Sequence, residues 1–272
     1  MKYSAMRLFL ALFLLVSAFG CTVNNVQEEK NLKTYFDEFN VDGTFAMFDN
    51  SRGQHIIYNL KRDTMAFSPA STFKIVNALI ALQTGRVSTD SFVIKWDGVV
   101  RGNSEWDKDL TLSEAFRVSS VPHFQQLARA IGRDTMRAWL DSVKYGNQKI
   151  GGSIDSFWLD NSLKITADAQ VWLVKMLYFK QLPFRLSVQE QVKKMMIREN
   201  NATYQLAYKT GWGKTETGNE LGWIIGWIEE NRHVYFFAMN LETPDHAIDM
   251  KNVREKILKN ILKKIGFFEG KM

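Results

Sequence analysis

The sequence predicts an α+β fold: one antiparallel sheet of about five to seven strands, flanked by helices and joined to a helical subdomain. Three observations predict it. Strand-like segments occur near both ends of the chain, the long middle carries helical periodicity, and a strongly amphipathic helix closes the sequence. Strands from both ends therefore flank a helical insertion, which favours a cleft between a sheet lobe and a helical lobe.

The strands are expected in two groups. The first pair occupies residues 43–48 and 56–58, joined by a turn of Asp, Asn, Ser and Gly at residues 49–53. Three further strands follow at residues 204–210, 221–229 and 234–241. Because Gly-rich and Asn-rich turns separate these three, we expect them to form an antiparallel meander.

The helices are identified by apolar residues that recur every three to four positions. They are expected at residues 32–39, 72–84, 122–131, 134–143, 167–179, 188–197 and 249–265. In the last of them Val253, Ile257, Ile261 and Ile265 form one apolar stripe. This stripe predicts that the closing helix packs on the sheet.

Composition excludes several classes of protein. Of the 272 residues, 46% are hydrophobic and 24% charged, which excludes a disordered or collagen-like chain. Four prolines and one cysteine exclude a Pro-rich scaffold and a disulfide framework. The net charge is only +6 and the sequence has no block of five basic residues, so nucleic acid is not expected as a partner. The four histidines, His55, His123, His233 and His246, show no metal-ligand spacing, so no metal is expected. The oligomeric state stays open.

The N-terminus has the pattern of an export signal. Lys2 and Arg7 precede an apolar run at residues 8–16, which is too short for the roughly 20 residues of a membrane span. We expect residues 1–20 to be a signal peptide, residues 21–272 the mature domain, and the polar residues 22–31 a tether. Cys21 lies where bacterial lipoproteins carry their lipid; the alternative is ordinary cleavage nearby that leaves Cys21 unmodified. The expected location is periplasmic, with membrane contact only through such a lipid anchor.

Ser71 and Lys74 are the first candidates for chemistry. Ser71 opens a predicted helix and Lys74 follows at i+3, where Cβ atoms lie roughly 5–6 Å apart. The N–H groups of a helix N-terminus suit a developing oxyanion. Lys74 lies close to the apolar stripe that contains Leu79, so we expect a desolvated, neutral amine that acts as a base or reacts with carbon dioxide. The alternatives are a helix cap for Ser71 and a lysine that reaches solvent for Lys74.

Two further segments carry candidate residues. Lys209, Thr210 and Gly211 are expected at a strand end, where a lysine can hold a substrate carboxylate and a glycine permits close approach of a substrate. The alternative is a solvated strand end followed by a turn. Ser119 and Ser120 precede Pro122, a good first helical residue, so they are either helix caps or include a second serine that relays a proton.

Four motifs follow one another along the chain: Ser71-Thr-Phe-Lys74, Ser119-x-Val121, Tyr145-Gly-Asn147 and Lys209-Thr-Gly211. Together they resemble the motif set of class D (oxacillinase-type) serine β-lactamases. The stretches at 95–98, 106–109 and 157–159 match that family as well, and the resemblance extends from about residue 43 to 254. It implies the β-lactamase/penicillin-binding transpeptidase-like fold, with the site between the two lobes.

The resemblance also implies roles for individual residues. Ser71 would attack the β-lactam amide and form an acyl-enzyme, and Lys74, carboxylated by carbon dioxide to N6-carboxylysine, would be the general base. No other cofactor is implied. Trp158 would donate a hydrogen bond to the carbamate, Ser119 would relay a proton, and Tyr145 to Asn147 would form a structural turn. The implied substrate-binding residues are Val121, Lys209, Thr210, Gly211, Trp212 and Arg254, with the backbone N–H groups of Ser71 and Trp212 as oxyanion hole.

Arg254 has an argument of its own. It shares the stripe of Ile257 and Ile261, and no acidic residue lies three or four positions away, so a pocket for an anionic ligand would explain it. The alternative is a frayed first turn with Arg254 in solvent.

The function expected from these residues is hydrolysis of penicillins and related antibiotics, which confers resistance. A β-lactam sensor or penicillin-binding domain that is acylated without turnover is one alternative, and a peptidoglycan DD-peptidase is another. Which β-lactams are preferred stays open.

Overall fold

The computed structural model describes residues 25–268. The expected signal peptide, residues 1–20, and Cys21 lie outside the described residues. Between residues 25 and 268 no helix has both the length and the hydropathy of a membrane span.

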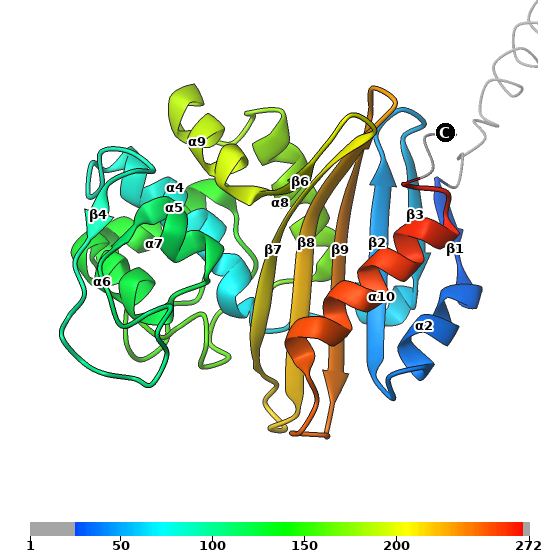
Figure 1. Cartoon of the computed structure of the whole chain (residues 1–272), viewed down its shortest axis with the longest axis horizontal. Coiled ribbons are helices and arrows are strands. Elements are labelled where there is room, and N and C mark those ends of the chain that lie inside the picture. The colour runs from blue at the N-terminus through cyan, green and yellow to red at the C-terminus, as the bar shows by residue number, and fades with distance from the viewer. Residues whose placement is uncertain (1–24, 269–272) are drawn as a thin grey trace, which may run out of the picture.

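A seven-stranded sheet forms the centre of the molecule, in the order β1-β3-β2-β9-β8-β7-β6 (Figure 1). Every neighbouring pair is antiparallel except β1 and β3, which run parallel. The strands are β1 Val26–Glu28, β2 Asp42–Asp49, β3 Gln54–Tyr58, β6 Ile197–Asn200, β7 Tyr204–Lys214, β8 Glu220–Glu230 and β9 His233–Thr243. The predicted α+β class, its five strands and the C-terminal meander are therefore confirmed.

The helices predicted from apolar periodicity are confirmed. They are α2 Lys33–Asp37, α3 Leu60–Asp63, α4 Lys74–Gln83, α5 Leu112–Arg117, α6 Val121–Ile131, α7 Arg133–Val143, α8 Ala167–Tyr178, α9 Leu186–Met196 and α10 Met250–Lys264. Two 3₁₀ helices, η1 Lys30–Leu32 and η2 Ala70–Phe73, precede α2 and α4. The short helices α3 and α5 and the small hairpin of β4 Val93–Ile94 and β5 Leu110–Thr111 were not predicted, because four- to six-residue segments show less than two turns of periodicity.

Three boundaries differ from the sequence prediction. The expected tether contains β1, whose side chains are exposed while its backbone pairs with β3, so polar composition concealed an edge strand. Ile197 begins β6 instead of ending α9. β7 continues to Lys214, so Lys209 lies in mid-strand and not at a strand end.

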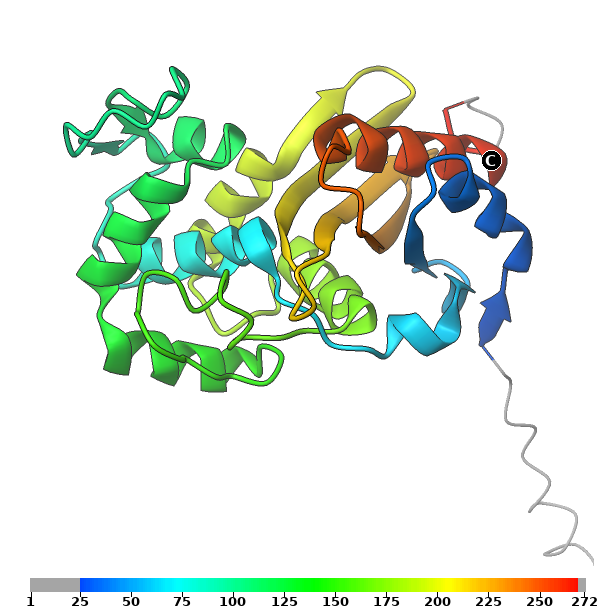
Figure 2. The ribbon, with the colours of Figure 1, turned by 90° about the horizontal axis from the view of Figure 1, so that it is seen from below.

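Helices cover both faces of the sheet (Figures 1 and 2). α10 and α2 pack on one face, where Phe237 and Ile261 belong to one apolar core. α8 and the helical lobe cover the other face, where Phe73 and Trp223 belong to a second core. Because both faces are covered, almost every residue of β8 is buried. The edge of the sheet at β7 meets the helical lobe, which places the predicted cleft there.

Candidate active site

η2 holds Ser71 between the sheet and the helical lobe. The Thr72 hydroxyl donates to the carbonyl of Pro69 (2.7 Å) and accepts from Nε2 of Gln170 on α8 (2.8 Å). The ring of Phe73 packs against the rings of three buried aromatic residues, Tyr145, Phe157 and Trp158, with centroid distances of 5.5, 5.1 and 5.4 Å. Ser71 makes no capping hydrogen bond at the start of η2 or α4, so the helix-cap interpretation is wrong.

Lys74 is entirely buried one turn after Ser71. Its Nζ donates to Oγ of Ser71 at 2.6 Å, and no part of the side chain reaches solvent, so the interpretation as a solvent-reaching lysine is wrong. Burial lowers the pKa of Lys74 from 10.5 to about 7, because the ammonium loses its hydration without gaining a carboxylate. The amine next to the serine is therefore about half neutral at neutral pH.

Trp158 carries an unsatisfied donor in the same region. Its indole is fully buried and stacks on Phe73, and its carbonyl accepts from the Ser68 hydroxyl at 2.8 Å. Its Nε1 has no hydrogen-bond partner within the part of the chain that the structure describes. A buried N–H without an acceptor is costly, so this donor is available to a small polar group that is not part of the described residues.

Lys209 faces the helical lobe from the middle of β7. Its side chain is fully buried, and Nζ donates to Oγ of Ser119 and to the carbonyl of Thr210, both at 2.9 Å. Burial and then the charge of Lys74 lower the pKa of Lys209 well below its ordinary value. The interpretation as a solvated strand end is wrong, because β7 continues pairing with β8 through Lys214.

Ser119 is held for this contact by its backbone. It lies between α5 and α6 with φ at +57°, a left-handed conformation in which residues other than glycine are uncommon. Gly211 has a structural reason as well: a Cβ there would lie 2.9 Å from the carbonyl of Pro69, so only glycine lets η2 approach β7 this closely. Asn147 accepts from the backbone N–H of Lys164 (3.0 Å), which agrees with the structural turn expected at 145–147.

Arg254 is buried at the start of α10. Its Nη1 donates to the carbonyl of Gly211 at 2.6 Å, and only 6% of the residue is exposed, so the interpretation as a solvent-exposed first turn is wrong. Nε has no hydrogen-bond partner among residues 25–268. Burial lowers the pKa of Arg254 to about 10, which still leaves the guanidinium charged at neutral pH.

A cavity of about 610 Å³ connects these residues. Of the predicted site residues it is lined by Ser71, Ser119, Val121, Thr210, Trp212 and Arg254. Pairing between β6 and β7 ends at Ile197 and Ala207, and from residue 208 onward β7 pairs only with β8. The cavity therefore lies along a free strand edge, where a ligand can bind beside the backbone. Lys74, Trp158 and Lys209 lie behind this surface.

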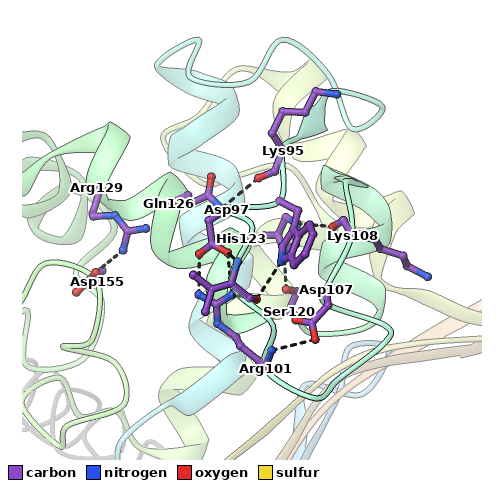
Figure 3. A network of polar contacts seen from close by, with 12 residues as sticks. Lys95, Asp97, Arg101, Asp107, Lys108, Ser120, His123, Gln126, Arg129 and Asp155 are labelled. Atoms are coloured by element: carbon purple, nitrogen blue, oxygen red, sulfur yellow. Dashed lines mark hydrogen bonds and ion pairs between the residues drawn. The ribbon is translucent and has the colours of Figure 1, made fainter.

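One wall of the cavity is a loop at residues 95–109 that is fastened to the start of α6 (Figure 3). Trp106 lines the cavity, and its Nε1 donates to the carbonyl of Val118 at 3.2 Å. The Lys108 carbonyl lies 3.1 Å from Nε2 of His123, so Nε2 donates and Nδ1 accepts the Ser120 hydroxyl at 2.7 Å. Burial lowers the pKa of His123, which keeps this bridge neutral. These two hydrogen bonds from the loop were not predicted, because they join residues twelve and fifteen positions apart.

Sequence reasoning also missed Arg117 and Arg198, which line the cavity. Arg198 lies one residue beyond the helix predicted at 188–197, and Arg117 belongs to none of the motifs. Among the described residues, no three His, Cys, Asp or Glu side chains gather where they could hold a metal ion.

Comparisons with known proteins agree with this geometry. The family described as the penicillin binding protein transpeptidase domain matches residues 23–263. The chain is similar to β-lactamase OXA-48 of Klebsiella pneumoniae, with 38% identity over 93% of this chain and 95% of that protein. It is 42% identical to the probable β-lactamase YbxI of Bacillus subtilis over 82% of each. Among solved structures, the class D β-lactamase FUS-1 (OXA-85) of Fusobacterium nucleatum subsp. polymorphum matches with a TM-score of 0.83 and 38% identity, covering 88% of this chain and 99% of that one.

Proposed function

The chain belongs to the class D β-lactamases and is a serine β-lactamase, and from this premise we propose that it hydrolyses penicillins and related antibiotics through an acyl-enzyme on Ser71, with carboxylated Lys74 as general base. One observation carries the proposal: a fully buried Lys74 amine, with a pKa of about 7, lies 2.6 Å from the Ser71 hydroxyl.

The surroundings of Lys74 suit carboxylation. In this step the neutral amine forms an N–C bond with carbon dioxide and releases one proton, which leaves a carbamate anion on Nζ. Trp158 is the residue that would hold it, because its buried Nε1 otherwise lacks an acceptor among the described residues. The carbamate would supply a base both for the Ser71 hydroxyl and for the water that releases the product.

The remaining residues act on the substrate. Ser71 Oγ gives up its proton and attacks the β-lactam carbonyl, after which the carbon–nitrogen bond of the ring breaks. The ring nitrogen leaves as an amine and needs a proton. The Ser119 hydroxyl would supply it, because Ser119 lines the cavity and its Oγ accepts a hydrogen bond from Lys209 Nζ at 2.9 Å. Thr210 and Arg254 line the cavity where a carboxylate next to that nitrogen would bind.

Nitrocefin hydrolysis tests this proposal. Steady turnover that is lost in Ser71→Ala and in Lys74→Ala, and an intact mass that gains and then loses one acyl group, would support it. A single stoichiometric burst with a permanent mass increase would overturn it in favour of a β-lactam sensor, and release of D-alanine from a peptidoglycan peptide without nitrocefin turnover would indicate a DD-peptidase.

We further propose that the chain is exported to the periplasm, where it would protect a bacterium against β-lactams, and that Cys21 carries a lipid. The support is the pattern of Lys2, Arg7, the apolar run and Cys21 in the sequence. Expression in a susceptible Gram-negative host should raise the inhibitory concentration of ampicillin, and palmitate labelling should be lost in Cys21→Ser. Activity confined to the cytoplasmic fraction would contradict export, and unlabelled wild-type protein would contradict lipidation.

A further inference from the structure

The cavity carries more positive charge than a β-lactam with one carboxylate can neutralise. Its lining includes four cationic side chains, Arg117, Arg198, Lys251 and Arg254, against two acidic ones, Glu105 and Glu255. None of the four cations forms an ion pair with another of residues 25–268 within 4.0 Å. Cations that share a cavity without ion pairs favour an anionic ligand.

Arg198 occupies a defined position at the end of the cavity next to β6, here called the β6 end. It belongs to β6, at the irregularity between the paired residues Ile197 and Glu199, and its Nε donates to the carbonyl of Tyr208 at 3.2 Å. Its guanidinium lies 5.5 Å from the centroid of the Tyr208 ring. Burial lowers the pKa of Arg198 most, and the charge of Arg117 lowers it further, whereas Tyr208 and Glu255 act in the opposite direction. Arg117 and Arg198 line the same cavity, and an anion bound near both guanidinium groups would offset the repulsion between their charges.

The position of this end relative to the substrate follows from strand geometry. Successive alternate residues of β7 are about 7 Å apart, so Tyr208 and Trp212 lie on opposite sides of Thr210. In a bicyclic β-lactam the carboxylate and the acylamino group project from opposite sides of the fused rings. With the carboxylate at Thr210 and Arg254 and the β-lactam carbonyl at the implied oxyanion hole of Ser71 and Trp212, the acylamino group would extend toward Trp212. The ring substituent next to the carboxylate would then extend toward Tyr208 and Arg198.

We propose that Arg198 and Arg117 form an anion subsite at the β6 end of the cavity, which binds a second negative charge on the ring substituent beside the substrate carboxylate. The inference rests on the proposed function and adds a substrate class to it: dianionic β-lactams of the cephalosporin type. Arg117 is exposed and Arg198 half-buried, so solvent and salt screen the attraction. We expect a preference of about three- to tenfold, the range of a partly screened charge pair.

The test uses two pairs of substrates. The first pair is two cephalosporins with the same acylamino side chain, one with a neutral and one with a carboxylate-bearing 3-substituent. The second pair is benzylpenicillin and its analogue with a carboxylate on the benzylic carbon, which places the added charge at the opposite end. The dianion-to-monoanion ratio of kcat/KM should exceed one for the first pair only, and should approach one in about 1 M salt.

Variants assign the effect to these residues. Arg198→Gln and Arg117→Gln should each reduce the ratio of the first pair severalfold, and Arg198→Lys should retain part of it because the charge remains. Arg86→Gln is the matched control, since it removes the same charge from an exposed position outside the cavity lining and should leave the ratio unchanged. Because Arg117 is exposed at the end of α5, its variant should fold even if Arg198→Gln does not.

Two results would overturn the subsite. One is an equal ratio in wild type and both glutamine variants, and the other is a preference for the dianion in the penicillin pair instead. Failure of the proposed function is recognised separately, because a protein that is acylated without turnover still yields the two ratios from its acylation rates.

Discussion

Carbon dioxide activation should depend on pH in a way that only a buried Lys74 produces. Only the neutral amine reacts, and when the reaction is written with bicarbonate, amine plus bicarbonate gives carbamate plus water, with no net release of a proton. The bicarbonate-ion concentration that gives half-maximal activity therefore depends on pH only through protonation of the amine. This quantity is a direct measure of the pKa of Lys74 in the folded protein.

The structure sets the expected magnitude. Burial lowers the pKa of Lys74 from 10.5 to about 7, so at pH 7 about half of the amine is neutral, against roughly one part in three thousand for an unburied lysine. The half-activating bicarbonate concentration should be constant from about pH 9 to 7.5 and should rise about tenfold per pH unit below about pH 6.5. An unburied lysine would show a tenfold change per unit over the whole range.

The assay is initial-rate nitrocefin hydrolysis by enzyme depleted of carbon dioxide and then titrated with bicarbonate at each pH. A titration at constant pH cancels changes in the rate constants themselves, because only the midpoint is compared. A midpoint that changes tenfold between pH 9 and pH 8 would refute the burial argument, and activity independent of bicarbonate would refute carboxylation itself.

Three further outcomes follow from buried polar groups. Trp158→Phe should slow deacylation about 10- to 100-fold, whereas Trp227→Phe, which removes another buried indole N–H that has no partner among residues 25–268, should not; equal deacylation in both variants would return Trp158 to a packing role. Burial raises the pKa of Asp63 to about 7, so folding favours the protonated carboxyl and the wild type loses stability as pH rises toward 7. In urea unfolding, Asp63→Asn should therefore gain stability relative to wild type between pH 5 and 8. A difference in unfolding free energy that stays constant over this range would contradict this. Burial lowers the pKa of His123, so the neutral imidazole stabilises the fold above pH 6.5 and this effect is lost on acidification, by at most about 1.4 kcal/mol per pH unit. The unfolding free energy of His123→Val should therefore fall less steeply below pH 6.5 than that of wild type. Identical slopes in the two proteins would exclude the imidazole as the cause.

Local periodicity was enough to predict most helices and strands of the fold, and to predict that Lys74 and Arg254 of the site are buried. The helix that carries Lys74 has a three- to four-residue repeat, which already indicated that this amine lies on a buried face, and the structure confirms it. Arg254 was assigned to the core-facing stripe of the last helix by the same argument, and it is buried. In both cases the apolar repeat that indicates the buried face lies within two helical turns of the residue.

Where the partners are distant, sequence reasoning failed. Val26–Glu28 has tether-like composition but forms a strand, because its backbone pairs with β3 almost thirty residues away. Lys209 was placed at a strand end because two glycines follow closely, whereas those glycines serve the approach of η2 and the strand continues. Nothing close to Arg198 in sequence shows that it lines the same cavity as Arg117.

The amino-acid sequence by itself determined the class of fold, the order of the motifs and the helix that joins Ser71 to Lys74, since each depends on contacts between residues close in the chain. Only the tertiary structure decided that Lys209 is buried against Ser119, that the Trp158 indole lacks an acceptor among the described residues, and that several arginines share the cavity. The physical reason is that desolvation and charge at a site are set by whatever packs on it, and here that packing joins strands and helices from opposite ends of the chain.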